Sequence, residues 1–281
     1  MLQETGIPKE AFISLFKLKI IIWTMIGVNI VFVVARTFAR YMKLRKVQLE
    51  DIMMYLALAF FLAMAGVYLL VLPPLYRVID VSAGRKPLYY GFFDDGYVII
   101  KGFFATTMLF WATLWAVKVS LLLLFRRLMV GLTNYMRLWW TLLIFTLITF
   151  VGCVVSEVLS CEHWFQIGIT GSCNSPRDEY AQKICLFYAL AADLITDILI
   201  MALPMRLLWN LRISRAEKIS VACIFGVGVI CMIFATIRVI SISQKAETGQ
   251  ASPTWLALWA VIEDSVGNIY RSCNRFLIIN D

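Results

Sequence analysis

Seven apolar runs along the chain are each about as long as a helix that crosses a lipid bilayer. About 20 residues of α-helix span the roughly 30 Å of hydrocarbon. The runs occupy approximately residues 20–41, 51–73, 98–125, 138–160, 184–206, 218–242 and 255–276. The alternating strands of a barrel are absent, and lipid offers no water to open backbone groups, so only helices can span. The sequence predicts an all-α fold, a polytopic membrane protein built as a seven-transmembrane helical bundle.

The composition agrees with a membrane protein and excludes an ordinary soluble domain. Of the 281 residues, 61% are apolar and 16% are charged, whereas soluble domains are about 45–50% apolar. The mean hydropathy is +0.81. No nucleic-acid-binding motif accompanies the net charge of +8, so we interpret the basic residues as contacts to anionic lipid. The expected partner of the surface is the bilayer, and no nucleic acid is expected.

The distribution of lysine and arginine predicts the orientation in the membrane. With the N-terminus outside, the inner segments carry thirteen of these residues and the outer segments ten. The inner ones crowd short loops, which favours a cytoplasmic C-terminus. Residues 1–19 then form a short extracellular tail, residues 20–276 the seven-span domain, and residues 277–281 a short cytoplasmic end. Lys17 and Lys19 lead directly into the first span, which we expect to remain as an uncleaved anchor.

Two aspartates interrupt the fifth apolar run, in the stretch DLITDILIMALP at residues 193–204. A carboxylate at the centre of a bilayer costs about 2.5–3.5 kcal/mol on insertion scales. Asp193 and Asp197 are four residues apart, so a helix places both on one face. We expect this face to point into the bundle, because intramembrane acids normally meet partner charges or a wet cavity.

Other ionisable residues within the spans offer partners for these acids. At 1.5 Å per residue, Lys118 of the third span and Asp197 both fall in the inner half of the membrane. Arg238 of the sixth span and Glu263 of the seventh both fall in the outer half. We therefore predict an ion pair between Lys118 and Asp197. A second pair joins Arg238 and Glu263, and Asp193 joins either one.

A third ion pair is expected near the inner end of the first span. Arg36 lies there, and the second span begins with two acids, Glu50 and Asp51, either of which can be its partner. For all the buried charges three roles stay open. They can fix helix register and assembly, they can line a pocket or switch, or they can relay protons.

Two cysteines flank the loop between the fourth and fifth spans, which reads CEHWFQIGITGSC. Under the predicted orientation this loop lies in an oxidising compartment. A disulfide between Cys161 and Cys173 is the favoured interpretation. The alternative is a metal site that adds His163 to the two thiols, but no second cysteine pair supports it.

Three motifs indicate the boundaries of spans. Pro73 and Pro74 are expected to close the second span, and Pro204 to end or kink the fifth helix. Trp139 and Trp140 stand beside a basic residue at the start of the fourth span, which is typical of an interfacial aromatic belt.

Catalytic motifs are missing from the sequence. There is no nucleophile–base–acid set, no metal-hydrolase motif and no phosphate-binding loop, and the scattered Ser and Thr residues have no adjacent His. We expect neither an enzyme nor a metal site.

Short motifs in a fixed order extend over most of the chain. Paired arginines end the first span, two acids begin the second, and a Gly-Arg pair and a Cys–Trp–Cys pattern follow in outer loops. Single charged or proline residues mark the third, fifth, sixth and seventh spans. The residues are Arg36, Arg40, Glu50, Asp51, Gly84, Arg85, Lys118, Cys161, Trp164, Cys173, Asp197, Pro204, Arg238 and Glu263. This order resembles the fungal rhodopsin-domain family of seven-span integral membrane proteins, which includes surface-sensing G-protein-coupled-receptor-like proteins. By this resemblance residues 20–276 are a rhodopsin-like domain.

The last span departs from the family pattern. Where the family usually carries a Pro and further cytoplasmic chain, this sequence has Asn274, Arg271 interrupts the span, and the chain stops at Asp281. Either the seventh helix is altered or the chain is truncated. Residues 255–276 contain no lysine, so a retinal Schiff base cannot form in the last span. We expect no cofactor and no light-driven pump.

The resemblance implies a receptor-like sensor of a surface or environmental cue in the plasma membrane. Its expected partners are a small molecule or surface outside and a cytoplasmic signalling protein inside. One alternative is a small-molecule or ion transporter or channel that uses the intramembrane charges. Another is a structural membrane protein without a signalling role, whose charges serve only folding.

Overall fold

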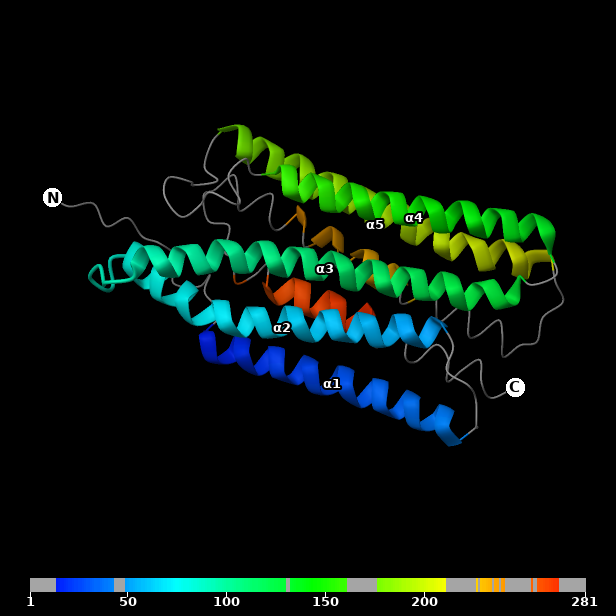
Figure 1. Ribbon diagram of the computed structural model, residues 1–281, viewed down its shortest axis with the longest axis horizontal. Coiled ribbons are helices and arrows are strands. Elements are labelled where there is room, and N and C mark those ends of the chain that lie inside the picture. Colours follow the sequence, from blue (N-terminus) through cyan, green and yellow to red (C-terminus); the bar gives the residue numbers. More distant parts are fainter. Residues whose placement is uncertain are drawn as a thin grey trace.

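The computed structural model describes residues 14–42, 49–129, 132–160, 176–210, 226, 228–233, 235–237, 239–240, 254 and 257–267. Within these ranges almost every residue is helical, and none lies in a strand. Figure 1 shows the helices running side by side along the long axis of the molecule. The predicted all-α membrane bundle is confirmed.

Within the described ranges, five helices are long and apolar enough to cross a membrane. They are α1 (Leu15–Met42), α2 (Leu49–Ser82), α3 (Phe92–Leu128), α4 (Thr133–Leu159) and α5 (Pro176–Asn210). Two further helical stretches lie between residues 226 and 240 and between residues 254 and 267. The first stretch falls within the predicted sixth span, and the second begins one residue before the predicted seventh span.

The helices extend beyond the spans that hydropathy predicts. α2 continues through Pro73 and Pro74 to Ser82, so the expectation that this pair closes the second span is wrong. α5 continues through Pro204 to Asn210, so this proline does not end its helix either. Proline removes one backbone donor, but neighbouring helices and local adjustments let membrane helices tolerate it. Hydropathy marks the length of helix in hydrocarbon and does not mark where the helix stops.

Among the described residues, the largest apolar core contains residues of all five long helices and of the 254–267 stretch. It contains Ile22 of α1, Phe61 of α2, Trp111 of α3 and Val261, all of which are buried. In Figure 1, α2 and α3 lie together in the middle of the bundle, with α1 beside α2 and with α4 and α5 on the opposite side. α3 is therefore the helix around which the rest is arranged.

The turn between α2 and α3, residues 83–91, begins with a glycine cap. Gly84 has a left-handed conformation with φ of 69°. The backbone N–H groups of Gly84 and Arg85 donate to the carbonyls of Val81 and Asp80 at 3.0 and 2.9 Å. This is a Schellman motif, in which glycine adopts the positive φ without a steric penalty.

A side-chain network joins α2 and α3 beside this turn. Arg77 donates through Nε and Nη2 to the two carboxylate oxygens of Asp95, at 2.8 and 2.9 Å. The Tyr89 hydroxyl donates to the same carboxylate. Desolvation and this hydrogen bond raise the pKa of Tyr89. Bidentate pairing fixes geometry as well as distance, so α2, the turn and α3 form one braced hairpin.

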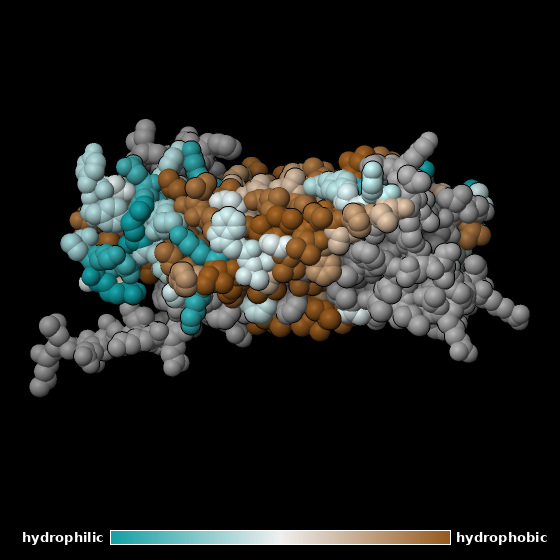
Figure 2. Space-filling view, turned by 90° about the horizontal axis from the view of Figure 1, so that it is seen from below, coloured by the Kyte–Doolittle hydropathy of each residue, from teal (hydrophilic) through white to brown (hydrophobic). Residues whose placement is uncertain are grey.

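An apolar belt covers the middle of the bundle. Figure 2 shows apolar residues across the middle of one face and hydrophilic residues gathered at the end that holds the α2–α3 turn. Large apolar side chains are exposed on the outer helices, for example Trp23 and Val31 on α1 and Ile148 on α4. Exposed apolar faces of this kind are expected where helices contact lipid, because the surrounding tails are themselves apolar.

Only one of the two tryptophans near the start of α4 is exposed as an aromatic belt at the membrane interface requires. Trp140 is half exposed, but Trp139 is only 1% exposed. The Trp139 indole Nε1 donates to the carbonyl of Leu122 on α3 at 2.7 Å. The belt assignment is therefore wrong for Trp139, because this residue faces α3 and ties two helices together.

α3 lies close to α2 at Gly102, where an added Cβ would overlap the Cγ2 methyl of Val71. Small residues permit such contacts between membrane helices. We expect Gly102→Ala to destabilise the protein by about 1–3 kcal/mol through overpacking. Thermal unfolding of the purified protein in lipid nanodiscs measures this loss.

The matched control is Gly96→Ala on the same helix, where nothing lies within 4 Å of an added Cβ. Alanine there should stabilise the helix by about 0.5–1 kcal/mol. Equal shifts of the unfolding midpoint for the two variants would contradict the close contact at Gly102.

Candidate functional site

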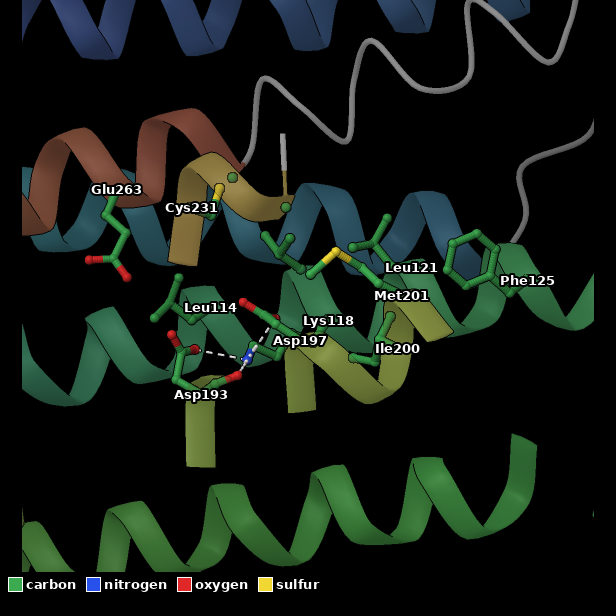
Figure 3. A pocket seen from close by; sticks show the side chains of 13 residues that line it. Leu114, Lys118, Leu121, Phe125, Asp193, Asp197, Ile200, Met201, Cys231 and Glu263 are labelled. Carbon is green, nitrogen blue, oxygen red and sulfur yellow. Dashed lines mark hydrogen bonds and ion pairs between the residues drawn. The ribbon is translucent and has the colours of Figure 1, made fainter. Parts of the chain in front are cut away.

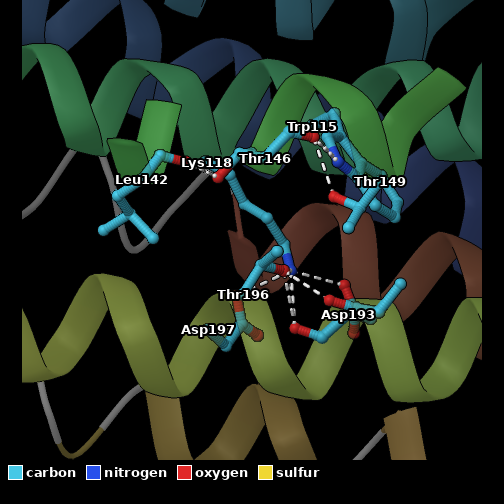
Figure 4. Close-up of polar contacts among 9 residues, drawn as sticks. Trp115, Lys118, Leu142, Thr146, Thr149, Asp193, Thr196 and Asp197 are labelled. Carbon is cyan, nitrogen blue, oxygen red and sulfur yellow. Dashed lines mark hydrogen bonds and ion pairs between the residues drawn. The ribbon is translucent and has the colours of Figure 1, made fainter. Parts of the chain in front are cut away.

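The charged residues predicted within the spans meet between α3 and α5. Lys118 lies within α3 and is only 4% exposed. Asp193 and Asp197 lie one turn apart on α5, and both side chains approach the Lys118 ammonium (Figure 4). The four-residue spacing places both acids on one face of α5, and this face lies toward α3.

The Lys118 ammonium is shared between both acids. Its Nζ lies 2.8 Å from Oδ1 of Asp193 and 2.8 Å from Oδ1 of Asp197. It also donates to the backbone carbonyl of Asp193 at 2.8 Å and to the Thr196 hydroxyl oxygen at 2.7 Å. An ammonium has three hydrogens, so four acceptors share three donors. The structure thus contains the contact expected between Lys118 and Asp197, and Asp193 joins it.

Thr196 is part of the same network, although sequence reasoning did not single it out. It is fully buried. Its Oγ1 lies 2.7 Å from the carbonyl of Ala192 and 2.9 Å from that of Asp193, to which it donates. The hydroxyl can therefore donate to its own helix while it accepts from Lys118. Its position three residues after Asp193, on the same helix face, is the signal that could have identified it.

Trp115 connects the charged cluster to α4. Its indole Nε1 donates to the carbonyl of Thr146 at 2.8 Å, and the Thr149 hydroxyl donates to the same carbonyl at 2.8 Å. The Lys118 Nζ lies 5.3 Å from the Trp115 ring centroid, within the range of cation–π attraction. α3 therefore carries one residue that contacts α4 and, one turn later, one that holds α5.

A cavity of about 60 Å³ adjoins the cluster. Residues of α3 and α5 line it together with Gly228 and Cys231 of the 226–240 stretch and Glu263 of the 254–267 stretch (Figure 3). One water needs roughly 10–15 Å³ of such volume, whereas pockets for drug-sized ligands are about 300–1,000 Å³. The cavity can hold a few waters or a small ion and is too small for a larger organic ligand.

Three carboxylates and one ammonium face this cavity. Asp193, Asp197 and Glu263 line it, and Lys118 is the one cationic side chain among the described lining residues. The side chain of Asp197 is 20% exposed, whereas that of Asp193 is 4% exposed. Asp197 is therefore the acid of the cluster that cavity water reaches most easily.

The pair expected at the inner end of the first span is also present. Nη2 of Arg36 lies 3.2 Å from Oδ1 of Asp51, and both residues are buried. The neighbouring Thr37 hydroxyl lies 2.9 Å from the Tyr55 hydroxyl. α1 and α2 are thus joined by polar contacts near the end opposite the α2–α3 turn.

The other predicted site residues lie outside what the structure describes. They are Arg238, Cys161, Trp164 and Cys173, together with the side chains of Arg40 and Glu50. The Arg238–Glu263 pair and the loop disulfide therefore stay predictions. Among the described residues, no group of three His, Cys, Asp or Glu side chains is placed to hold a metal ion.

A polar contact between α4 and α5 was not predicted from the sequence. The Cys185 thiol lies 3.3 Å from Oε2 of Glu157 and 3.4 Å from the Ser156 hydroxyl. Glu157 stands near the end of an apolar run, where hydropathy gives no sign of a partner on another helix. The contact joins α4 and α5.

The chain was compared with protein families, with curated proteins and with solved structures, and only the first comparison gives a match. The sequence profile of the fungal rhodopsin domain matches residues 35–275. That range includes the Lys118 cluster, the Arg36–Asp51 pair and the cavity. No curated protein and no solved structure matches the chain.

Replacing Lys118 with methionine should leave two carboxylates without their cation inside the bundle. Loss of one partner of a buried ion pair costs about 3–5 kcal/mol, so Lys118→Met should strongly lower the thermal unfolding midpoint in lipid nanodiscs. The matched control is Lys101→Met on the same helix, since Lys101 is exposed and its Nζ lies over the Tyr97 ring. That change should stay within about 0.5 kcal/mol. Similar losses for both variants would show that the Lys118 contacts add nothing to stability.

Proposed function

The chain belongs to the fungal rhodopsin-domain family, and on this premise we propose that it is a receptor-like membrane sensor of a surface or environmental cue. The bundle receives the cue on one side of the membrane and changes its helix arrangement. A cytoplasmic signalling protein, for which a G protein is the first candidate, reads that change on the other side.

The shared ammonium is the observation that carries this proposal. A single lysine on α3 holds two acids one turn apart on α5, each at 2.8 Å. Because the acids repeat along the helix axis, the ammonium can favour either one, and each choice corresponds to a slightly different position of α5 against α3. Packed helices switch between discrete arrangements and do not deform continuously. The cluster is therefore suited to a two-state element.

The size of the cavity supports a switch in preference to a cue-binding pocket at this depth. A volume of about 60 Å³ leaves no room for a drug-sized ligand. The cue would then act at the end of the bundle. The α2–α3 turn presents exposed Arg85, Lys86 and Tyr90 there and is braced to both long helices.

The protein would lie in the plasma membrane, as the family resemblance implies. Its N-terminus would lie outside and its C-terminus in the cytoplasm, because the distribution of basic residues favours this orientation. It would work without a cofactor and without enzymatic activity. The lack of lysine in residues 255–276 and the lack of catalytic motifs in the sequence support both statements.

A transporter or channel is the second candidate, and the line of carboxylates on the cavity favours it. Intramembrane acids often mark ion paths. Against it, the sequence contains no inverted repeat and no pair of broken helices in corresponding halves, which many transporters have. A structural protein whose charges serve only folding is the third candidate.

GDP exchange by a fungal heterotrimeric G protein added to nanodiscs tests the sensor function. We expect Asp197→Asn to change the exchange rate at least about fivefold from wild type, the lower range of allosteric coupling. Asp94→Asn, which alters an exposed acid on α3, should leave the rate unchanged.

Exchange no faster than with empty discs, for wild type and for Asp197→Asn alike, would contradict the sensor function. Ion flux into proteoliposomes that Asp197→Asn abolishes would favour the transporter. If both assays are negative and only protein abundance falls, the structural role is the remaining candidate.

A further inference from the structure

The cluster between α3 and α5 is one positive charge short. Asp193 and Asp197 both contact Lys118, and within the described part of the chain neither acid has another cationic partner. Lys118 can neutralise one of them. We propose that the two carboxylates together hold one exchangeable proton, so that this cluster is a proton-binding site within the bundle.

The hydrogen-bond donors at the site lead to the same conclusion. The Lys118 ammonium donates to a backbone carbonyl and to the Thr196 hydroxyl oxygen, which leaves one hydrogen for the two carboxylates that it approaches at 2.8 Å. Oδ1 of Asp193 has no hydrogen-bond partner among the described residues. Thr196 directs its own hydrogen to the backbone of α5. An ionised carboxylate accepts at about four positions and donates none. A proton on one acid adds a donor to the site, which can bond to water in the cavity.

Water in the cavity can supply the proton. The cavity reaches both acids, its volume of about 60 Å³ accommodates a few waters, and Asp197 is partly exposed to it. In the protonation step a hydronium ion in this water transfers its proton to a carboxylate oxygen and leaves a water molecule. Release is the reverse step, so the site needs no other reactant.

Other titratable and charged groups surround the cluster on neighbouring elements. α4 contributes Cys153, the 226–240 stretch contributes Cys231, and the 254–267 stretch contributes Glu263. Glu263 makes a further contact of its own, so its charge is not part of the deficit at Lys118. Arg238 lies outside the described residues. The charge deficit is therefore assigned only to the three residues whose contacts the structure gives.

As a statement about the cue, this inference rests on the sensor function proposed above. Protonation of one acid leaves Lys118 with the other, so proton uptake selects one of the two positions of the ammonium. The proton would then be the signal that the α3–α5 contact reads. As a statement about binding, the inference depends only on the geometry of the cluster, and the two statements are measured separately.

Infrared difference spectra of the wild-type protein in nanodiscs, recorded between acidic and alkaline buffer, test the binding. We expect a carboxylic-acid C=O band at the acidic end that shifts in heavy water. Asp193→Asn and Asp197→Asn should each remove it, because one acid then remains for one lysine. Asp94→Asn should keep it. If wild type lacks the band, or if it persists unchanged in both cluster variants, the proposal is overturned.

The pH dependence of unfolding is the second measurement, and it applies even if one variant folds poorly. The native state would bind one proton more than the unfolded state, so stability should fall as pH rises, by at most about tenfold in the unfolding equilibrium per pH unit. Asp197→Asn should remove this slope. Stabilisation by sodium over potassium or choline at fixed pH, without a C=O band, would assign a metal cation to the site and overturn the proton.

The GDP-exchange assay repeated across the same pH range separates the two statements. Exchange that follows the titration of the C=O band, and loses its pH dependence in Asp197→Asn, supports the proton as the cue. A band that titrates while exchange stays constant leaves the proton site intact and removes the sensor function in this form. Exchange that depends on pH without any titrating band overturns the proton site alone.

Discussion

A charge inside a lipid-spanning bundle must be neutralised by other protein groups, since the lipid cannot solvate it. Here one lysine on α3 serves two acids on α5, and the rest of the arrangement depends on that contact. Trp115 holds α3 to α4 one turn away, and α2 is braced to α3 through the Arg77–Asp95 pair. α3 is therefore fixed on two sides, and its polar contact with α5 depends on the single ammonium of Lys118.

The sequence predicted the helical membrane bundle and the contact between Lys118 and Asp197, which depends on depth. The rise of 1.5 Å per residue sets how far each residue lies along its helix, which is why the sequence predicts a pair between Lys118 and Asp197. For Arg36 the sequence left two partners, Glu50 and Asp51, and the structure shows Asp51. The four-residue spacing of the two aspartates likewise required a common face. Both arguments use only geometry within one helix and the thickness of the membrane.

Features that depend on how helices turn toward one another could not be predicted. Trp139 resembles a residue of the membrane interface, yet it turns inward to the Leu122 carbonyl. Thr196 donates to its own helix as other buried threonines do, and the lysine that contacts it lies on α3. For these two residues the deciding partner lies on another helix, and hydropathy has no information about it. The proline pair at 73–74 lies inside α2, since membrane helices tolerate proline where neighbouring helices and local adjustments satisfy the freed backbone groups.

The central claim is that one ammonium is energetically shared by the two acids of α5. Double-mutant cycles between Lys118→Met and each of Asp193→Asn and Asp197→Asn, read from unfolding free energies in nanodiscs, test it most directly. Both cycles should give interaction energies of about 0.5–3 kcal/mol, with each double variant less destabilised than the sum of its single changes. Additivity within about 0.5 kcal/mol in both cycles would contradict the account.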